Sequence, residues 1–576
     1  MVEKVVDKLT QYRRAEAPLP TTNRILPTYG AGFENVGRDG QPIDVPMPTY
    51  GPDELLVRHD ACGLCFSDIK IIKLGQEHPR IHRKDMQTNP IVQGHEVCLT
   101  VVGVGAKLRN QYHVGDRFIV QADIFVKGVG WAYGYEIQGG LSEYSVIDQR
   151  VLNGDDGNYL IPVQPNTGYA ESALTEPWAC VIAAYGLKYR TALKSNGTAW
   201  IIGTSPDDPK PYTISAGFDA ASHPSKLLLT DVSAKFAAWL TDRARTLGVE
   251  VIEVGDLANP PVQHIDDVVL LGIDPAIIET VSPRLADFGV FAILADKPAD
   301  RRVSVDIGRI HYNRWIYVGG TKPDIARAYG DVPARPVLKG GGRVWFVGAG
   351  GPMGRMHVQR AIQIAEGPGT IVCTDVSDLR LTELCESFEA EARAKGIEFI
   401  CLNPTVKDAY TAGMARFKDQ GFDDIVVLAP IPAVISDAGT YLAPNGTMNI
   451  FAGVARGTFA DLELSGVYLK GMRFFGHSAS SIDDLRLMLH QAESGELSTN
   501  RAVAAVGSLS ASKDGLVAVR DTALAGKVVI FPHIKEMPLT PLPELKDKLP
   551  TVYARLKNGR EWTLEAEQEF LRLMLE

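Results

Sequence analysis

Three short segments of this 576-residue chain carry side chains that could together bind a metal ion. A thiolate, an imidazole and a carboxylate suit tetrahedral Zn²⁺, and the ligands Cys65, His95 and Glu96 would leave a fourth position for water or substrate. We therefore predict a catalytic zinc site, against the alternative of a core cysteine with unrelated turn residues. The segments are Gly63-Leu-Cys65-Phe-Ser67-Asp68, Gly94-His95-Glu96 and Thr175-Glu176-Pro177.

Neighbouring polar side chains could support this metal site. Asp68 could hold the second ring nitrogen of His95 and so fix its tautomer. Ser67 could relay the proton of a substrate hydroxyl. Glu176 could hydrogen-bond the metal-bound water or replace it as a fourth metal ligand. Together with the three ligands, these residues form the predicted catalytic set.

A glycine-rich segment in the second half of the chain could bind a dinucleotide. Glycines let the backbone approach a pyrophosphate, and the amino end of the expected following helix supplies N–H groups and a positive dipole. The spacing is irregular, because a GxGxxG frame from Gly348 ends on Met353 and one ending on Gly354 starts at Ala349. The segment reads Gly348-Ala-Gly350-Gly351-Pro352-Met353-Gly354 and follows the apolar run 344–347.

The choice between NAD and NADP rests on the end of the next expected strand. Asp375 lies 21 residues after Gly354. A carboxylate there accepts hydrogen bonds from the ribose hydroxyls and repels a 2′-phosphate, so NAD is favoured. Arg380 follows closely in the sequence and weakens that preference.

An internal repeat organises the second half of the chain. Trp200-Ile-Ile-Gly203 recurs as Trp345-Phe-Val-Gly348, and Asp266-Asp-Val-Val-Leu270 recurs as Asp423-Asp-Ile-Val-Val427. Three further strings recur in the same order, and the offsets of all five run from 144 to 157 residues. Because strand, loop and helix alternate in both copies, we predict two tandem Rossmann-type doubly wound parallel sheets.

The first copy differs where a phosphate would bind. Gly203 is followed by Thr-Ser-Pro-Asp-Asp-Pro-Lys-Pro, in which prolines lack N–H donors and Asp207 and Asp208 would repel phosphate. Asp231 persists at the ribose position. We interpret this copy as a degenerate Rossmann domain with a structural or assembly role, and a second nucleotide site there is the minor alternative.

The remaining segments complete the predicted division of the chain. Residues 30 to about 190 show short alternating strands and many turn residues, which is typical of a β-rich domain. The segment 481–540 returns to that style, and the tail becomes helical from about Thr563. The predicted parts are 1–196, a catalytic β-rich domain; 197–335, the degenerate repeat; 340–480, the NAD-binding domain; 481–540, the return to the catalytic domain; and 541–576, the tail.

Composition excludes several classes of protein. Hydrophobic residues make up 45% of the chain and charged residues 22%, as in an ordinary globular protein. The net charge of -10 argues against broad nucleic-acid binding. No apolar run is long enough for a membrane span, and the charged stretch from Met1 to Arg14 lacks a signal-peptide core, so we expect a cytoplasmic protein. Seven sparse cysteines predict no disulfide framework.

The metal-ligand pattern resembles the polyol-dehydrogenase branch of the zinc-dependent medium-chain dehydrogenase/reductase family. The resemblance extends through Val101-Val-Gly-Val-Gly105, Val114-Gly-Asp-Arg117 and Gly139-Gly-Leu-Ser-Glu-Tyr144. It implies a GroES-like catalytic domain, zinc ligands at Cys65, His95 and Glu96, and a further glutamate at Glu176. It also places Ala452, Gly453, Gly476 and His477 near the nicotinamide.

Two positions depart from the family pattern. Many members hold a second, structural zinc in a four-cysteine lobe, but no cysteine lies between Asp116 and Glu143, so one catalytic zinc is expected. Lys70 stands where alcohol dehydrogenases carry a histidine that extends the proton relay. The relay must therefore differ here or end in solvent.

The predicted function is a zinc-dependent oxidoreductase that transfers hydride between NAD(H) and a polyol or sugar, phosphorylated or not, and its keto form. The basic segment 77–84 is either a solvated loop or a clamp for a substrate phosphate or carboxylate. Several strings look like the sorbose-1-phosphate reductase group. Rival hypotheses are a zinc-free enoyl or quinone reductase and a non-catalytic NAD-binding sensor or scaffold.

The expected partner is a small-molecule substrate, with neither nucleic acid nor membrane. Members of the family usually associate through a Rossmann-sheet edge, placed here near Thr447–Phe451. Either a homo-oligomer forms through that edge, or the first repeat occupies it and makes a pseudo-dimer within one chain.

Overall fold

The computed structural model describes residues 8–576, so part of the charged stretch from Met1 to Arg14 lies outside the described residues. The chain divides into two compact units. Unit 1 comprises the chain up to Ile182 together with Ala479–Glu576, and unit 2 comprises Ala183–Ser478. Among residues 8–576, none of the helices combines the length and the apolar character needed to cross a membrane. The finer five-part division stays a prediction.

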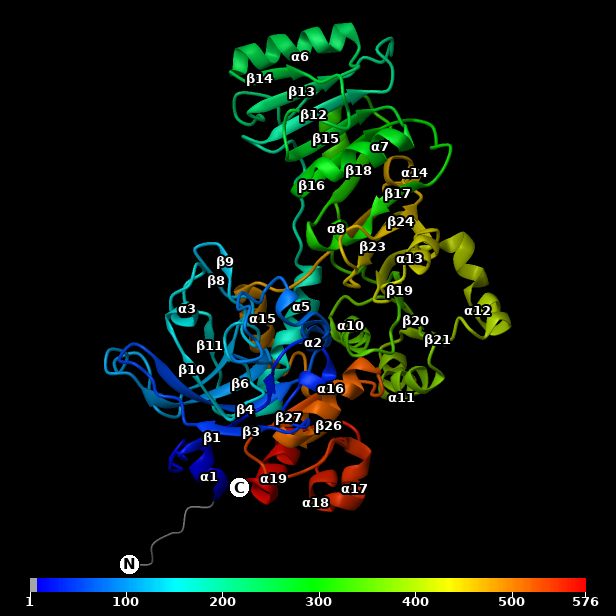
Figure 1. Cartoon of the computed structure of the whole chain (residues 1–576). Helices are drawn as coiled ribbons and strands as arrows, with labels where there is room; N and C mark the ends of the chain where they lie inside the picture. The colour runs from blue at the N-terminus through cyan, green and yellow to red at the C-terminus, as the bar shows by residue number, and fades with distance from the viewer. Residues whose placement is uncertain (1–7) are drawn as a thin grey trace, which may run out of the picture. The chain divides into compact units, whose positions relative to one another are not determined.

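Unit 1 is built round an eight-stranded, mostly antiparallel sheet (Figure 1). The strand order is β11-β7-β6-β4-β27-β26-β28, and β10 also pairs with β4. Strand β4 is buried along its whole length. Strands from the carboxyl-terminal segment thus complete a sheet begun far earlier in the chain. Their bounds are β4 Leu55–Gly63, β6 Glu96–Val104, β7 Arg117–Val120, β10 Tyr144–Ile147, β11 Leu160–Pro162, β26 Val503–Ser508, β27 Lys527–Phe531 and β28 Thr540–Pro541.

The carboxyl-terminal tail ends in helix α19, Leu564–Met574, as predicted. The Thr563 side chain accepts a hydrogen bond from the Ala566 N–H and begins the helix. Glu567 accepts hydrogen bonds from the backbone N–H groups of Tyr169 and Ala170, at 2.6 and 2.8 Å. The tail is therefore fastened to unit 1 by a buried carboxylate.

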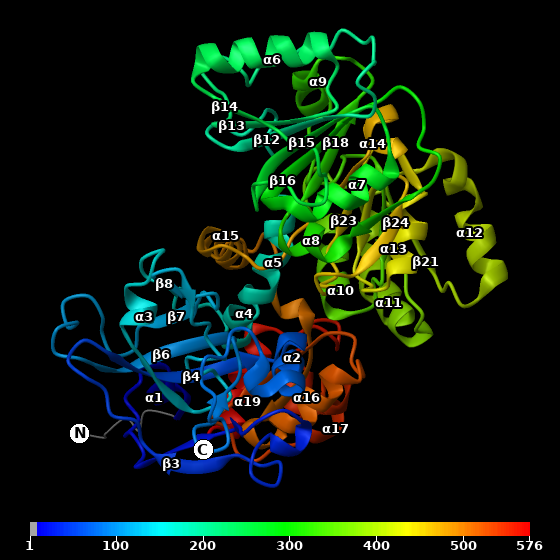
Figure 2. The same ribbon diagram turned by 45° about the horizontal axis from the view of Figure 1, so that its top comes forward.

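Unit 2 contains two six-stranded sheets, all parallel (Figures 1 and 2). Their orders are β14-β13-β12-β15-β16-β18 and β21-β20-β19-β22-β23-β25, which is the Rossmann order 3-2-1-4-5-6 in both. The predicted fold class of two tandem Rossmann-type sheets is confirmed. The bounds are β12 Thr198–Gly203, β13 Lys226–Thr230, β14 Glu250–Glu253, β15 Ile265–Leu271, β16 Leu285–Leu294, β18 Ile316–Gly320, β19 Arg343–Val347, β20 Thr370–Thr374, β21 Glu398–Leu402, β22 Phe422–Val427, β23 Leu442–Ile450 and β25 Arg473–Gly476.

The two repeats differ most in the connection after their first strand. In the second repeat β19 leads into helix α10, Pro352–Gln363. In the first repeat the described residues 204–225 form no helix before β13. Pro206, Pro209 and Pro211 remove N–H donors from this stretch, which opposes a helix. The first repeat therefore lacks the helix whose amino end binds pyrophosphate in this fold.

Helices cover both faces of each sheet (Figure 2). Helices α6 and α9 pack on one face of the first sheet, and α7 packs on the other. In the second repeat α12 and α13 contribute Phe417 and Ile435 to the core that α7 also joins. The bounds are α6 Ala234–Leu247, α7 Pro275–Val281, α9 Ile325–Gly330, α11 Asp378–Ala394, α12 Lys407–Gln420 and α13 Pro432–Gly439.

The sulfurs of Cys385, in α11, and Cys401, in β21, are joined as a disulfide. The other five cysteines are free. The sequence predicted no disulfide framework, and one bridge between neighbouring elements of the second repeat is the exception.

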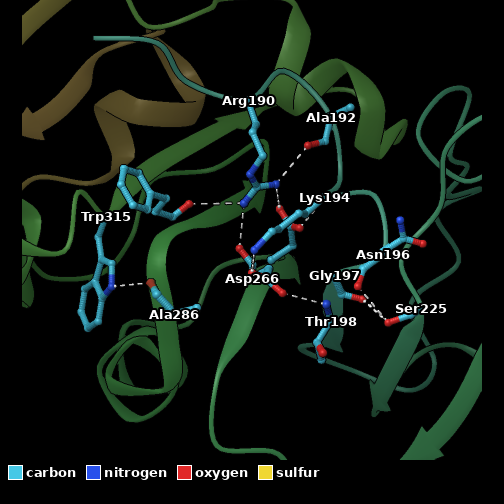
Figure 3. A network of polar contacts seen from close by, with 12 residues as sticks. Arg190, Ala192, Lys194, Asn196, Gly197, Thr198, Ser225, Asp266, Ala286 and Trp315 are labelled. Atoms are coloured by element: carbon cyan, nitrogen blue, oxygen red, sulfur yellow. Dashed lines mark hydrogen bonds and ion pairs between the residues drawn. The ribbon is translucent and has the colours of Figure 1, made fainter. Parts of the chain in front are cut away.

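An ion-pair network at the start of the first repeat ties its entry segment to β15 (Figure 3). Arg190 pairs with the buried Asp267 at 2.8 Å, and the Lys194 N–H donates to the same carboxylate at 2.8 Å. The Lys194 ammonium pairs with Asp266, which also accepts the Thr198 N–H at 2.9 Å. Two adjacent aspartates thus hold three residues of the segment that leads into β12.

The second repeat contains the same network. Arg335 pairs with Asp424 at 2.8 Å, and the Lys339 N–H donates to Asp424 at 2.8 Å. The Lys339 ammonium pairs with Asp423 at 2.6 Å, and Asp423 accepts the Arg343 N–H at 3.0 Å. The duplication detected in the sequence therefore extends to individual side-chain contacts.

The two repeats contact each other reciprocally. Strand β17, Val303–Asp306, of the first repeat pairs antiparallel with β24, Phe459–Leu462, of the second. Helix α8, Ile307–Tyr312, packs on β25, and helix α14, Ser465–Leu469, packs on β18. This exchange of equivalent contacts is the pattern of an isologous, two-fold interface, here formed within one chain.

The sheet edges at this interface correct one prediction. Thr447–Ile450 lie in β23, which is an interior strand between β22 and β25, so they are not the sheet edge. The terminal strand is β25, and it lies against β18, the terminal strand of the first sheet. One hydrophobic core runs through both repeats, from Trp200 to Phe474. The prediction took β23 for the edge strand. In the sequence β24 and α14 separate β23 from the short strand β25, which is the actual edge.

Candidate metal centre and coenzyme site

Pairing of β4 with β6 brings the predicted metal ligands together. In this antiparallel pair Gly63 lies opposite Glu96, so the end of one strand meets the start of the other. Cys65 follows β4 and caps helix α2, Phe66–Leu74. Its backbone N–H donates to Asp68 Oδ2 at 2.9 Å. A separation of thirty residues in the sequence is thereby closed by one strand pair.

The ligand atoms of Cys65, His95 and Glu96 all lie within 4.8 Å of one another. His95 and Glu96 are buried. Glu96 Oε2 is buried without a hydrogen-bond partner in the structure, and an orphaned carboxylate oxygen is costly unless something binds it. A Cβ on Gly63 would lie 2.2 Å from this oxygen, so glycine is required there. The donor set and the orphaned oxygen fit a zinc ion.

Asp68 lies where the sequence placed it, behind His95. Its Oδ1 is 3.5 Å from His95 Nδ1, and both side chains are buried. Burial alone would lower the pKa of His95, but Asp68 and the Cys65 side chain together raise that pKa well above its ordinary value. Ser67 follows in the first turn of α2, half-buried at the same end of the helix.

Lys527 completes this cluster and was missed by the sequence analysis. It begins β27, is 5% exposed, and its ammonium lies 2.5 Å from Glu96 Oε1. Burial would lower the pKa of Lys527, but Glu96 and Cys65 raise it, so the ammonium stays charged. It lies 431 residues from Glu96, in a segment whose pattern indicates only a strand. No local signal could have assigned it.

Glu176 lies near the three ligands but outside their close group. It is the second residue of helix α5, Thr175–Tyr185. Burial raises the pKa of Glu176 to about 7, with His95 lowering it and Glu96 raising it. A carboxyl group whose pKa lies near neutral pH can both accept and release a proton there, so it is suited to exchange protons with a bound water. Its role as a fourth ligand stays a prediction.

Part of the basic segment 77–84 is fixed by structural ion pairs. Arg83 pairs with Glu136 at 3.1 Å and also donates to backbone carbonyls. Arg80 pairs with Asp123, and its side chain remains 41% exposed. Arg83 therefore serves the local fold, whereas Arg80 keeps an accessible face.

Tyr135 connects this segment with the metal ligands. Its ring centroid is 5.8 Å from that of His95 and 5.3 Å from that of His78. The Arg80 guanidinium carbon is 5.9 Å from the same ring. Burial, with Arg80 and Lys70 nearby, lowers the pKa of His78 to about 4. The Arg80 guanidinium therefore borders the ring that packs on His95.

The glycine loop divides its roles among Gly348, Gly351 and Gly354. Gly348 has φ +83°, which favours glycine. A Cβ on Gly351 would meet nothing within 4 Å, which leaves open space at the amino end of α10, where Pro352 is the first helical residue. A Cβ on Gly354 would lie 2.5 Å from the Ala349 carbonyl oxygen, so the helix packs tightly there. These three glycines are thus spaced three residues apart, and neither GxGxxG frame contains all three of them.

Asp375 lies beside this loop, as its position after β20 predicts. It is 7% exposed, and its Oδ2 accepts the Gly350 N–H at 3.0 Å. Arg380 is adjacent, since a Cβ on Gly350 would lie 2.7 Å from its Cβ. Val376, Leu379 and Ile431 expose 68%, 65% and 51% of their surface at the carboxyl edge of the sheet. Exposed apolar side chains at that edge suit an adenine ring.

The predicted nicotinamide contacts lie at the carboxyl ends of two adjacent strands. Ala452 and Gly453 follow β23, and Gly476 ends β25 with His477 next. Ile450 and Gly476 are register partners, so the four residues are brought together. His477 is buried.

Comparison with known proteins supports the same class. Residues 51–153 match the family model of the alcohol dehydrogenase GroES-like domain. Mannitol-1-phosphate 5-dehydrogenase of Aliivibrio fischeri is 23% identical over 91% of this chain and 93% of its own length. L-sorbose 1-phosphate reductase of Klebsiella pneumoniae is 22% identical over 91% and 93%.

Solved structures agree in fold. A short chain alcohol dehydrogenase from Escherichia coli complexed with NADH has a TM-score of 0.50 at 12% identity, over 89% of this chain and 100% of that chain. An Escherichia coli oxidoreductase of unknown specificity also has a TM-score of 0.50, at 13% identity over 89% and 99%. The resemblance to the medium-chain dehydrogenase/reductase family is confirmed. The chain is thus similar to oxidoreductases of the alcohol and polyol dehydrogenase type.

Proposed function

We propose that the chain is a zinc-dependent, NAD-linked dehydrogenase that interconverts a phosphorylated polyol and its keto form. The observation that carries the proposal is the close group of Cys65, His95 and Glu96, with an orphaned Glu96 oxygen buried beside it. A zinc-free reductase of this fold has no use for such a group. Asp375 favours NAD over NADP.

The side chains of the site have distinct tasks. Cys65, His95 and Glu96 would hold zinc, which when bound polarises a substrate oxygen and lowers the pKa of an alcohol. Asp68 orients His95, and Lys527 holds one Glu96 oxygen so that the other remains available. Ser67 would relay the hydroxyl proton of the substrate, accepting it while releasing its own proton toward solvent. A bound nicotinamide coenzyme would supply the redox chemistry as the hydride acceptor.

The substrate class rests on two supports. Two of the relatives that align over most of this chain are named for phosphorylated sugars or sugar alcohols. Arg80, with its partly exposed guanidinium near Tyr135, could pair with a substrate phosphate in place of Asp123. The clamp interpretation of segment 77–84 therefore narrows to Arg80.

A screen of NAD⁺ reduction over free and phosphorylated polyols tests the proposal. We expect turnover with at least one polyol phosphate, about one zinc per chain by metal analysis, and loss of both in Cys65→Ser and Glu96→Ala. Arg80→Ala should raise KM for the phosphorylated substrate about tenfold or more and leave a free polyol unaffected. Full activity in both ligand variants would exclude the zinc mechanism. NADH binding without turnover on any polyol would favour the sensor hypothesis.

A further inference from the structure

The loop 451–458 follows β23 at the carboxyl edge of the second sheet. In a Rossmann sheet the dinucleotide lies across this edge, with one half on each side of the switch point. The glycine loop and Asp375 lie on the β19–β20 side, so the nicotinamide half falls to the side of β22, β23 and β25. The loop 451–458 is therefore the nicotinamide-side loop of the second repeat.

The first repeat holds the far end of this loop by hydrogen bonds. The Ile307 N–H donates to the Thr458 carbonyl oxygen at 3.0 Å. The Gly457 N–H donates to Asp306 Oδ2, also at 3.0 Å. A third bond runs from Arg456 Nε to Asn313 Oδ1, at 2.9 Å. Asp306 and Ile307 lie at the start of α8 and Asn313 follows its end, so all three bonds involve an end of this helix.

Close packing holds the rest of the loop. A Cβ on Gly308, inside α8, would lie only 2.1 Å from the Ala455 carbonyl oxygen. His311, one turn later, donates from Nδ1 to the Ile450 carbonyl oxygen at 3.0 Å. A Cβ on Gly476 would lie 2.8 Å from the His311 Cα. Helix α8 is thus fitted to both strand ends that border the nicotinamide side.

The reverse contact exists for the first repeat. The Ala299 N–H donates to Ser465 Oγ at 3.0 Å, and the Tyr468 hydroxyl donates to the Lys297 carbonyl oxygen at 2.9 Å. Residues of α14 therefore hold the loop after β16 as residues of α8 hold the loop after β23. Only the second repeat has a glycine loop and helix for a dinucleotide, so only one of these two contacts borders a working coenzyme site.

We propose that the first repeat positions the nicotinamide-side loop of the second repeat through α8, in the manner of a partner subunit built into the chain. Residues Asp306, Gly308 and Asn313 are positioning residues, since they act on the coenzyme through the loop. This inference rests on the proposed binding of NAD by the second repeat.

The test is Gly308→Ala, which places a methyl group against the Ala455 carbonyl and displaces the loop. Alanine is the better helix former, so α8 itself is not weakened. Gly330→Ala is the matched control, because it ends α9 of the same repeat and its Cβ would meet only Thr191 O at 3.9 Å. The probes are NADH, whose nicotinamide reaches the loop, and ADP-ribose, which lacks the nicotinamide ring.

We expect Gly308→Ala to raise the Kd for NADH about tenfold and to leave the Kd for ADP-ribose within about twofold. Gly330→Ala should change neither. Arg456→Ala removes the exposed side chain that bonds to Asn313, and it should raise the Kd for NADH while leaving the Kd for ADP-ribose unchanged. This variant serves as the test if Gly308→Ala does not fold. The inference would be overturned if wild type, Gly308→Ala and Arg456→Ala all bound NADH with equal affinity. If wild type binds neither NADH nor ADP-ribose, the proposed function fails instead.

Discussion

At the residue scale, the proposed metal centre depends on how Glu96 divides its two oxygens. Oε1 is held by Lys527, and Oε2 has no hydrogen-bond partner. A carboxylate held by a cationic partner at one oxygen can still offer its second oxygen to a metal ion. Lys527 therefore prevents Glu96 from standing as an uncompensated charge when metal is absent, and it limits how strongly Glu96 donates to a metal.

Replacement of the lysine tests this division. Lys527→Met leaves the Glu96 carboxylate buried and unpaired, so the metal-free protein should lose about 3–5 kcal/mol of unfolding free energy. Because zinc would supply the missing positive charge, zinc should stabilise the variant more than it stabilises wild type. Thermal unfolding in EDTA and in zinc measures both effects. Lys548→Met is the control, since Lys548 and Glu544 form an exposed pair of little energetic weight.

The ligands and their partner differ in how far the sequence reveals them. Cys65, His95 and Glu96 lie within a short stretch whose types and spacing indicate zinc, and one strand pair brings them together. Lys527 reaches Glu96 only because β27 completes a sheet that begins with β4. A lysine at the start of an apolar strand looks the same whether it faces solvent or a buried carboxylate. Contacts between remote strands cannot be read from local pattern.

At the element scale, the paired aspartates explain why part of the repeat has persisted. In each repeat the first aspartate of the Asp-Asp pair holds a lysine ammonium and a backbone N–H, and the second holds an arginine. These bonds fix where the chain enters the first strand of each sheet. The loop after that strand differs between the repeats, because only the second repeat follows it with the glycine segment and helix α10.

Removal of the second aspartate in either repeat should be costly. Asp267→Ala and Asp424→Ala each leave a partly buried arginine unpaired, so each should lower the unfolding free energy by about 3 kcal/mol. Because both repeats share one hydrophobic core, both variants should shift the same cooperative transition of unit 2 in denaturant titrations. Asp242→Ala, in an exposed pair with Arg245, should change little. Separate transitions for the two repeats would contradict a shared core.

The elements themselves were largely predictable, and the exceptions have physical reasons. Strand and helix alternation predicted both sheets, because buried parallel strands are continuous apolar runs. The three prolines at 206, 209 and 211 signalled that phosphate contacts were lost, although not that the whole helix is absent. The glycine frame was ambiguous because roles in phosphate binding depend on φ and close approach, which letters alone do not specify.

At the scale of the whole molecule, the duplication converts a sheet edge into an internal interface. An exposed parallel edge strand is a template for pairing with another chain. Strand β25 is buried throughout, lies against β18, and its Arg473 donates to the Val332 carbonyl oxygen at 2.6 Å across the interface. The first repeat thus takes the place that a second copy would fill in a symmetric dimer.

This arrangement predicts that protection of β25 does not depend on association between chains. In hydrogen exchange, peptides covering residues 473–476 should exchange slowly, and equally so at low and high protein concentration, because their cover belongs to the same polypeptide. Strand β21, at the opposite edge of the same sheet and half-exposed, should exchange faster and serves as the internal control. Light scattering at each concentration reports whether chains associate. If protection of β25 falls on dilution together with the measured mass, a second chain covers that edge, and the internal pseudo-dimer is not what protects it.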